Sequence, residues 1–405
     1  MKKKVIIVGG GFGGLETALS LWNLLKSSAD ITLINRNAFH SFIPSIHEVI
    51  SGKVRPRDIQ LPLPLVLSPT DIHFVQDEVV SVDPGKRQVI TRSGVMEFDY
   101  LVLSCGAEDN FYGVPGVEEF SHRFRSPEDA ERIHADVNQL LQDENSSCNL
   151  IVAGGGPEGV EVAGELIDLV RECGREKDLD SGRITVELIE GKARLLSAFP
   201  VKAQDFVEEY LSRLGVKIFT GSGIVEVQKN KVVLYSGIKR DMSVLIWTGG
   251  LQPSRLLRGL PLSKDDQGWL KVTDRLHSPD NDSVYGVGDL ISIYDKKGPV
   301  TVSRLAHYAL DQALVASLNI YYDIHGRRRV GYAPKVKPQL VSMGKNMGIL
   351  TRGDSVISGP SVVLLKKLVQ MRHLITYLTK PAFSAISAKL PGAEFRHLLR
   401  RLLPI

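Results

Sequence analysis

Near its N-terminus the chain reads Val5-Ile6-Ile7-Val8-Gly9-Gly10-Gly11-Phe12-Gly13-Gly14. An apolar strand here runs directly into glycines with GxGxxG spacing, and a helical pattern follows from residue 15 to about residue 26. In such a turn the first glycine allows the tight bend, the second lets a pyrophosphate approach the backbone, and the third lets the helix pack on the strand. The free N–H groups at the helix N-terminus face the phosphates. The stretch therefore predicts a dinucleotide-binding βαβ unit.

The same design occurs a second time, as Leu150-Ile151-Val152-Ala153-Gly154-Gly155-Gly156-Pro157-Glu158-Gly159. A helical pattern again follows, from residue 160 to about residue 173, and each copy leads to another apolar strand, at residues 31–34 and 184–189. One GxGxxG is weak evidence by itself. Two copies in matching strand–turn–helix contexts indicate two nucleotide sites.

These repeats predict an α/β fold with two Rossmann-like dinucleotide-binding domains, one inserted in the other, followed by a C-terminal membrane-associating region. We place the first domain at residues 1–112 and 283–330, the second at 113–282, and the C-terminal region at 331–405. Short apolar runs predict further strands at residues 79–82, 88–91, 100–104, 224–227, 232–235 and 244–247.

The composition is that of a globular protein, with 405 residues, 43% apolar and 24% charged. No secretory signal is visible, and no apolar run reaches the roughly 18–20 residues that a spanning helix needs. Cys105, Cys148 and Cys173 form no CxxC pair and no metal-ligand cluster. We therefore expect no bound metal and a reducing compartment.

Charge is distributed unevenly along the chain. Residues 327–405 carry 15 Lys and Arg against 2 Asp and Glu, a net +13, whereas the preceding 326 residues carry 35 against 44, a net −9. A basic tail on an acidic body points to an anionic partner for the tail. The tail lacks interleaved aromatics and any zinc or helix-turn-helix pattern, so a membrane surface fits better than nucleic acid.

The residue after the second strand of each unit bears on nucleotide choice, because an acidic side chain there grips the ribose hydroxyls. In the second unit this residue is Glu190, whose charge would repel a 2′-phosphate and so favours NADH over NADPH. Lys192 and Arg194 lie close by and act against that preference. In the first unit the position holds Asn35, followed by Arg36. Asn35 can bond a ribose or can simply be a turn residue.

With these features the chain resembles the flavoprotein reductases with two dinucleotide domains, and most of all the type II NADH dehydrogenases, relatives of the sulfide:quinone oxidoreductases. The resemblance covers nearly the whole chain. It rests on both glycine turns and on three further stretches, Asp99-Tyr100-Leu101-Val102-Leu103-Ser104-Cys105-Gly106, Trp247-Thr248-Gly249-Gly250 and Val284-Tyr285-Gly286-Val287-Gly288-Asp289.

The resemblance implies FAD at the first turn and NADH at the second. It assigns Asp289 to the ribityl chain of FAD and makes Cys105 a small wall residue rather than a redox thiol. The FAD-binding residues it implies are Gly9, Gly11, Phe12, Gly13, Gly14, Asn35, Arg36, Pro44, Val80, Ser104, Cys105, Gly106, Gly288 and Asp289. The NADH-binding residues are Gly154, Gly156, Glu158, Gly159, Glu190, Thr248 and Gly249.

Three side chains are candidates for two family residues near the flavin, a glutamate and a lysine. Glu161 matches a glutamate on the helix of the nicotinamide domain, and a buried carboxylate there would tune hydride transfer electrostatically. Lys366 or Lys367 matches a lysine at the quinone face; both fall on one helical stripe with Gln370 and His373. The alternatives are an ordinary polar residue stabilised by the helix dipole and a solvated basic stripe.

Two histidines lie in the stretch from residue 39 to residue 52, which resembles the segment beneath the flavin ring. His40 and His47 could carry protons, or they could be satisfied structural groups.

The family pattern fails at the helix that should face the quinone. The family has an Ala-Gln pair and a second glutamine three to four residues on, where this chain has Arg304 and Tyr308. Arg304, Leu305, His307 and Tyr308 could serve a different quinone or another acceptor, or could merely line a helix. A sulfide:quinone oxidoreductase would need a redox cysteine in the C-terminal part, and none follows Cys173. A disulfide reductase is excluded because the CxxxxC or CxxC pair is missing.

The C-terminus shows apolar residues with i, i+3, i+4 spacing opposite arginines: Phe395, Leu398, Leu399, Leu402 and Leu403 against Arg396, Arg400 and Arg401. A short basic amphipathic helix of this kind lies in a bilayer interface. Alternatively it packs on the body or makes a contact in a homodimer.

We therefore expect a monotopic respiratory-chain enzyme on the cytoplasmic side of the cell membrane. It would transfer electrons from NADH through FAD to a membrane quinone without pumping protons. A reductase for a soluble or protein acceptor is the alternative within redox chemistry. A protein that senses the dinucleotide state and holds a partner on its basic tail is the alternative outside it.

Overall fold

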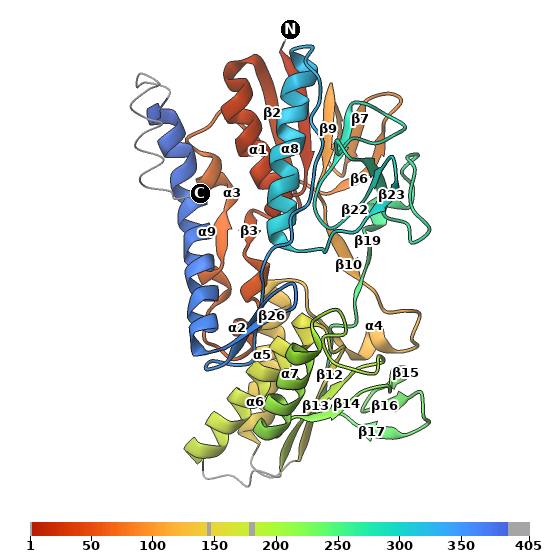
Figure 1. Cartoon of the computed structure of the whole chain (residues 1–405), viewed down its shortest axis with the longest axis vertical. Helices are drawn as coiled ribbons and strands as arrows, with labels where there is room; N and C mark the ends of the chain where they lie inside the picture. The colour runs from red at the N-terminus through yellow and green to blue at the C-terminus, as the bar shows by residue number, and fades with distance from the viewer. Residues whose placement is uncertain (1, 144–146, 178–182, 388–405) are drawn as a thin grey trace.

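The first glycine turn joins a parallel sheet to the helix that covers it. The computed structural model describes residues 2–143, 147–177 and 183–387. The sheet has the order β21-β9-β1-β2-β5 and all its strands are parallel. Its strands are β1 (Lys3–Val8), β2 (Ala29–Asn35), β5 (His73–Gln76), β9 (Tyr100–Leu103) and β21 (Val284–Gly286). Two helices, α1 (Phe12–Leu25) and α8 (Ala306–Ile324), pack side by side against this sheet (Figure 1).

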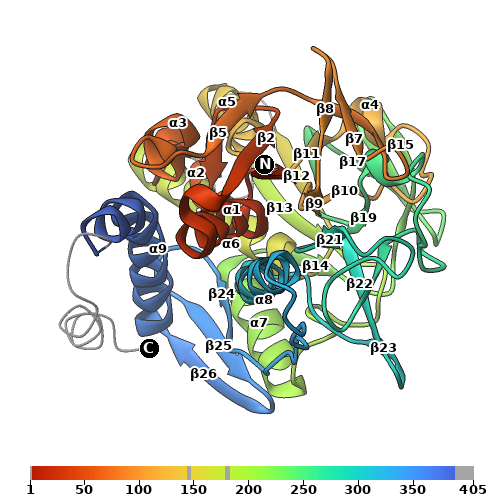
Figure 2. The same cartoon turned by 90° about the horizontal axis from the view of Figure 1, so that it is seen from above.

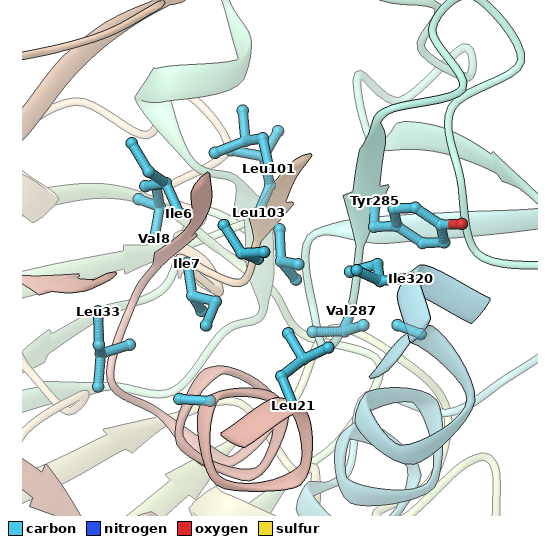
Figure 3. Close-up of a cluster of buried hydrophobic side chains, with 14 of the residues drawn as sticks. Ile6, Ile7, Val8, Leu21, Leu33, Leu101, Leu103, Tyr285, Val287 and Ile320 are labelled. Carbon is cyan, nitrogen blue, oxygen red and sulfur yellow. The ribbon is translucent and has the colours of Figure 1, made fainter. Parts of the chain in front are cut away.

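Figure 3 shows the core between this sheet and the two helices. Leu21 from α1 and Ile320 from α8 meet Ile7, Leu103 and Val287 from the sheet side, and each of these five side chains is fully buried. Branched aliphatic side chains on both faces of a parallel strand are expected, because helices cover both sides. β21 and α8 follow the second unit in the chain, so the second unit is an insertion in the first.

The second unit repeats this arrangement below the first (Figure 1). Its parallel sheet has the order β11-β18-β12-β13-β14. The strands are β11 (His122–Arg123), β12 (Cys148–Ala153), β13 (Ile184–Ile189), β14 (Lys217–Phe219) and β18 (Val244–Trp247). Helices α5 (Pro127–Gln142), α6 (Pro157–Lys177) and α7 (Val201–Leu214) pack on it. Two parallel sheets of this type, one interrupting the other, confirm the predicted fold class.

Small antiparallel sheets and short helices complete the two units. The three-stranded sheets are β6 (Val79–Asp83), β7 (Gln88–Thr91) and β8 (Val95–Glu97); β15 (Ile224–Gln228), β16 (Lys231–Leu234) and β17 (Lys239–Asp241); and β20 (Leu270–Thr273), β22 (Ile291–Asp295) and β23 (Gly298–Val300). The two-stranded pairs are β3 (Phe39–Ser41) with β4 (Gln60–Pro62), and β10 (Ala107–Asp109) with β19 (Leu251–Pro253). The short helices are α2 (His47–Ile50), α3 (Leu63–Leu67) and α4 (Val117–Phe120).

The six further strands predicted from apolar runs are all present, each within one residue at either end. Both helices after the glycine turns begin three residues earlier than predicted, at Phe12 and Pro157. The reason is that the last part of each GxGxxG segment already has helical geometry. The free N–H groups of the first helical turn therefore lie within the glycine segment itself.

The C-terminal part forms the antiparallel sheet β24 (Gln339–Ser342), β25 (Gly348–Arg352) and β26 (Ser355–Gly359), followed by α9 (Pro360–Ser387). α9 runs along one side of the first unit, and its lower end reaches the top of the second unit (Figure 1); the small sheet lies beside it (Figure 2). Within the described residues, no helix is both long enough and apolar enough to cross a bilayer. The amphipathic segment predicted around residues 395–403 lies outside the described residues.

Candidate active site

The first glycine turn has the geometry that its spacing predicts. Gly9 has a φ of +106°, and a Cβ atom on it would lie 2.5 Å from the carbonyl oxygen of Ser104. A Cβ atom on Gly14 would lie 1.8 Å from the carbonyl oxygen of Gly9. Gly11, in contrast, faces open space, with no atom within 4 Å of an added Cβ. The turn is therefore closed where backbone meets backbone and open where a pyrophosphate would approach, which fits a bound dinucleotide.

The second turn repeats this geometry. Gly154 has a φ of +112°, with the Thr248 carbonyl oxygen 2.6 Å from an added Cβ. Gly159 would bring a Cβ to 1.8 Å from the Gly154 carbonyl oxygen, and Gly156 faces open space. Both turns therefore leave the same backbone position open for a pyrophosphate.

A hydroxyl from a neighbouring strand end braces each turn. Ser104 Oγ donates to the carbonyl oxygens of Val8 at 2.7 Å and Gly9 at 3.1 Å. Thr248 Oγ donates to the two equivalent carbonyl oxygens of the second turn at 2.9 and 3.2 Å. Satisfying these buried carbonyls holds both turns in their strained conformation.

The predicted ribose-binding side chains also brace the turns. The Gly10 N–H donates to Asn35 Oδ1 at 2.9 Å, and the Gly155 N–H donates to Glu190 Oε2 at 2.6 Å. Glu190 Oε1 accepts a second bond, from the Lys192 N–H at 2.7 Å. Each carboxylate oxygen has further acceptor capacity, so these bonds orient Glu190 without using it up.

The two turns differ in what binds the carbonyl oxygen of the residue after the first glycine, which is Gly10 in the first turn and Gly155 in the second. The Gly155 carbonyl accepts from the backbone N–H of Leu196 at 2.8 Å. The Gly10 carbonyl lies 3.0 Å from Nδ1 of His40, whose Nε2 lies 2.9 Å from Nε2 of His373 on α9. Burial lowers the pKa of His40 to about 4 and that of His373 to about 3. Both rings are therefore neutral near pH 7, so His40 serves a structural contact and is not poised as a proton carrier.

A buried polar cluster joins the helix of the second turn to α9. Lys366 Nζ donates to Glu161 Oε1, and it also lies 3.1 Å from Ser342 Oγ and 3.3 Å from His47 Nε2. His47 Nδ1 lies 3.3 Å from Glu161 Oε2, and the Ser342 N–H donates to Glu161 Oε1 at 3.1 Å. All four residues are buried, each less than 10% exposed as a whole.

Burial sets the protonation of this cluster. It raises the pKa of Glu161, against the opposing charge of Lys366. It also lowers the pKa of His47 well below the usual value, with Lys366 and Lys53 acting in the same direction. A neutral His47 donates from Nδ1 to Glu161 and accepts at Nε2, which agrees with the distances around it.

Of the two candidate lysines, the structure brings Lys366 to Glu161 and leaves Lys367 outside. The Lys367 side chain is 51% exposed, with Nζ 3.9 Å from Glu48 Oε1. One residue along a helix is a rotation of about 100°, which separates the two ammonium groups.

Asp289 lies three residues after the end of β21, at the wall of a cavity of about 420 Å³. The Gly288 N–H donates to Gln312 Oε1 at 2.7 Å, and Arg304 Nε donates to the Asp289 carbonyl at 2.9 Å. The Arg304 guanidinium also stacks on the Trp269 ring, 3.6 Å from its centroid. Burial raises the pKa of the Asp289 carboxyl group, opposed by the charges of Arg125 and Arg304.

The helix residues predicted at the quinone side separate into two groups. Arg304, Leu305 and Tyr308 line the Asp289 cavity. His307 is not in this wall; its carbonyl accepts from Lys337 Nζ at 3.4 Å, and burial lowers its pKa to about 4. His307 Nε2 is buried without a hydrogen-bond partner.

Four of the remaining predicted residues lie at or beside the first turn. Phe12 packs on His40 and His373, with ring centroids 5.1 and 4.8 Å apart. Gly13 fits against Val287, whose Cγ2 would lie 2.9 Å from an added Cβ. Burial raises the pKa of Cys105, which keeps its thiol protonated, and Gly106 beside it has a φ of +70°.

The others lie further out or at the second turn. Arg36 is exposed, Pro44 lies in a short 3-10 turn, and Val80 on β6 is 52% exposed. Glu158, in the second turn, accepts from Arg125 Nη1 at 3.2 Å, while Gly249 lies against the Trp247 ring. The geometry gives Arg36 and Val80 no special environment.

Ser342 and Gln312 were not predicted as site residues. Each acts through an ordinary polar contact with a residue far away in the chain, Ser342 with Glu161 and Gln312 with Gly288. Neither contact has a local sequence signal. Among the described residues, no group of three or more His, Cys, Asp or Glu side chains could hold a metal ion.

Together the fold and the paired turns define a protein built around two dinucleotide sites. A family model described as pyridine nucleotide-disulphide oxidoreductase matches residues 3–313. The chain therefore belongs to the pyridine nucleotide-disulphide oxidoreductase family.

Individual relatives agree with this membership. A type II NADH:quinone oxidoreductase of Staphylococcus aureus is 24% identical over 382 residues, covering 92% of this chain and 95% of the relative. The demethylphylloquinone reductase NdbB of Synechocystis is 25% identical over 387 residues, covering 93% of each chain. The solved structure of NDH2 from Plasmodium falciparum in complex with NADH has the same fold, with a TM-score of 0.84, 20% identity and coverage of 98% of this chain and 100% of that one.

Proposed function

We propose that this chain is an FAD-dependent NADH:quinone oxidoreductase that does not pump protons. The observation that carries the proposal is the pair of matched dinucleotide turns with the Glu161–Lys366 pair buried next to the second. Two dinucleotides held by one chain suit electron transfer between them. The family membership and the names of the relatives support the same reaction.

In this proposal FAD occupies the first turn, with its pyrophosphate at Gly11 and its ribityl chain near Asp289. Asp289 follows a strand of the same sheet as the first turn, so both groups belong to one cradle. Arg125, which binds Glu158 at the second turn, also acts electrostatically on Asp289. The charges around the two nucleotide sites are therefore close enough to interact.

NADH occupies the second turn, and the surroundings of Glu190 favour it over NADPH. The carboxylate is oriented by two backbone N–H groups. The positive charge of Arg194 would favour a 2′-phosphate, but Arg194 is paired with Asp205 and Glu208. Lys192 Nζ donates to Ser197 Oγ at 3.2 Å. Both basic side chains thus have other partners, so the negative charge of Glu190 decides the preference and disfavours the 2′-phosphate of NADPH.

FAD bound at the first turn would supply hydride acceptance from NADH and the transfer of two electrons to the acceptor. Reduction of a quinone to a quinol takes two electrons and two protons. The hydride carries two electrons and one of these protons, so one further proton must come from side chains near the acceptor. Glu161, with its raised pKa, holds a proton more readily than an exposed glutamate. Lys366 carries donor hydrogens next to it, and Ser342 Oγ connects Lys366 to His47. We assign proton supply to this cluster.

We propose a quinone as the acceptor, although Arg304 and Tyr308 stand where the family has glutamines. These two side chains and Leu305 line the cavity beside Asp289. The Arg304 guanidinium is held by the Asp289 carbonyl and the Trp269 ring, so it presents a fixed positive charge there. This charge therefore lies in the cavity that the proposal gives to the ribityl chain of FAD.

An anaerobic absorbance experiment tests the central proposal. Flavin bands should bleach when NADH is added to the purified protein and should return when a short-chain quinone is added. Bleaching without return would reject the quinone and favour a soluble or protein acceptor. Protein without flavin bands, even after reconstitution with FAD, would overturn the proposal.

The Glu161→Gln variant tests the role of the carboxylate. We expect slower flavin reduction by NADH in stopped flow, because an amide can neither hold nor release a proton at this position. The matched control is Glu165→Gln, the next acidic residue along α6, which pairs instead with Lys53 at 2.7 Å. Equal rates for Glu161→Gln and wild type would remove Glu161 from the reaction.

We further propose that the enzyme lies on the cytoplasmic surface of the cell membrane, with α9 against the lipid. The outer face of α9 is apolar and 40–60% exposed at Leu364, Leu365, Leu368, Val369, Met371, Ile375 and Leu378. The net charge of +13 over residues 327–405 complements an anionic leaflet. An apolar helix face with basic surroundings is typical of monotopic attachment.

Sedimentation with anionic liposomes tests this attachment. Wild type should co-sediment, and Leu368→Glu with Ile375→Glu should reduce the bound fraction. Deletion of residues 391–405 should reduce it further if the predicted amphipathic helix contributes. Unchanged binding in both variants would reject this surface, and a change of oligomeric state instead would make it a dimer contact.

A further inference from the structure

The inner face of α9 is polar, and each of its polar residues is bonded to the body of the protein. The spacing over four turns is i, i+4, i+7, i+11 and i+14, which is one stripe of a helix. Its members are Lys366, bonded to Glu161; Gln370, bonded to Ser45; His373, bonded to His40; and Tyr377 and Lys380, both bonded to Glu16. α9 is therefore fastened by specific hydrogen bonds rather than by apolar packing alone.

The His373 bond is the one that reaches the first glycine turn. Because the Gly10 carbonyl can only accept, His40 must donate to it from Nδ1. A neutral imidazole carries one proton, so Nε2 of His40 is an acceptor and His373 donates to it from Nε2. Both rings are neutral near pH 7, because burial depresses the pKa of each. The chain of bonds thus has one direction, from α9 to the turn.

Ring packing reinforces this link. The His373 ring lies 4.8 Å from Phe12, 5.0 Å from Phe42 and 4.6 Å from Tyr377, measured between ring centroids. Phe12 is the first residue of α1 and belongs to the GxGxxG segment itself. A displacement of His373 would therefore change both the support of the Gly10 peptide and the packing of the turn.

We propose that His40 and His373 link α9 to the first glycine turn and hold the turn in position. The affinity for FAD then depends on the position of α9 relative to the turn. The inference rests on the proposed function, in which the first turn holds FAD. The equivalent carbonyl of the second turn, that of Gly155, has no bond to α9, because it is bound by the backbone of Leu196 in its own unit. His40 and His373 are positioning residues and touch no reacting atom in this account.

The test uses the full-length holoprotein and the His373→Phe variant, which keeps an aromatic ring and removes the donor. FAD release is followed by the rise of flavin fluorescence after dilution, and NAD⁺ affinity is measured by calorimetry on the same samples. A net hydrogen bond of about 1 kcal/mol corresponds to a roughly 2- to 10-fold effect. We expect FAD release to accelerate by this factor, with unchanged affinity for NAD⁺.

Two further variants separate positioning from general damage. Gln370→Leu breaks the neighbouring bond to Ser45 on the same stripe, and it should leave FAD release unchanged. His373→Gln places an N–H donor near the position of the imidazole Nε2, and it should restore much of the wild-type rate. The His373→Gln variant also keeps the test decisive if His373→Phe folds poorly.

FAD release at the wild-type rate in His373→Phe would overturn this inference and leave the proposed function intact. A loss of NAD⁺ affinity equal to the loss of FAD affinity would also overturn it, because the effect would then be global. Wild-type protein that binds no FAD at all would overturn the proposed function and this inference together.

Discussion

The two glycine turns are the same in backbone geometry and differ in their support. In both, the first glycine has a φ above +100° and the last glycine lies against its carbonyl. The difference is the carbonyl of the residue after the first glycine: that of Gly155 is held by a backbone N–H, and that of Gly10 by His40. The geometry of a nucleotide cradle is thus local, whereas the parts that hold it can come from the far end of the chain.

The comparison extends to the helices that follow the turns. Glu16 and Glu161 each stand two residues after the last glycine of their turn, and each is bonded to a lysine of α9. Glu161 has Lys366, and Glu16 has Lys380 together with the Tyr377 hydroxyl at 2.7 Å. Equivalent carboxylates in the two units therefore share a partner helix but differ in their other bonds.

The largest expected effect is a loss of folding stability when one of these ion pairs is broken. Lys366→Met leaves Glu161 as a buried charge without its cation, and loss of one partner of a buried pair costs about 3–5 kcal/mol. Lys380→Met should cost roughly 1 kcal/mol, because the Lys380 side chain is 28% exposed against 11% for Lys366, so solvent screens its ion pair more strongly. Urea-unfolding midpoints measure both. Equal losses would show that the two carboxylates are equivalent after all, and Lys366→Met with Glu161→Gln should recover part of the loss.

The next effect is on binding, with one alanine in each turn. Gly14→Ala and Gly159→Ala each place a Cβ 1.8 Å from a carbonyl oxygen. Overpacking of this kind costs about 1–3 kcal/mol, or roughly 10- to 100-fold in affinity. Gly14→Ala should lose FAD, and Gly159→Ala should lose NAD⁺ while keeping its flavin. If either variant weakened both ligands equally, the two turns would not be independent.

Lower pH should weaken the folded state through the buried histidines. The pKa of His40 falls to about 4 and that of His373 to about 3 in the folded protein, against 6.5 when unfolded. The unfolded chain thus binds more protons below pH 6.5, so stability present above that pH is lost as the pH falls. Each histidine contributes a slope of about 1.4 kcal/mol per pH unit. His373→Phe should therefore show a shallower decline of the unfolding midpoint between pH 6.5 and 4.5, and an unchanged slope would contradict the folded-state pKa.

The smallest effect is expected from the bracing hydroxyls. Ser104→Ala and Thr248→Ala each remove a donor to two carbonyl oxygens, at a cost of about 1 kcal/mol. Ser104→Ala should weaken FAD binding and Thr248→Ala NAD⁺ binding, each by a few-fold. Calorimetry on the four combinations of variant and ligand would show whether each hydroxyl serves only its own turn.

The parts of the fold with a local signal were predictable from the sequence. GxGxxG after an apolar strand has one common structural solution, so both turns, their helices and the parallel sheets follow from a few residues each. The insertion of one unit in the other also followed, from the order of the predicted elements along the chain. The boundaries of the six shorter strands agreed within one residue because apolar runs and turn residues alternate clearly there.

The contacts of α9 were only partly predictable. Helical periodicity placed Lys366, Gln370 and His373 on one stripe, and the structure places these three on the inner face. Lys367, grouped with them in the prediction, is half-exposed on a neighbouring face. The partners Ser45 and His40 lie more than 300 residues away in the chain, and periodicity contains no information on such pairings.

The spacing of Lys366 and Lys380 along α9 matches the spacing of their partners, Glu161 in the second unit and Glu16 in the first. Lys366 and Lys380 are fourteen residues apart, which at 1.5 Å per residue is about 21 Å along the axis and close to four whole turns. Because it is bonded to Glu161 through Lys366 and to Glu16 through Lys380, α9 links the two Rossmann units through equivalent glutamates. Inserting one alanine between the lysines would rotate one end by about 100° and detach it. Inserting a full turn would keep both lysines facing inward. Both ion pairs could then form only if the two units moved about 5 Å further apart.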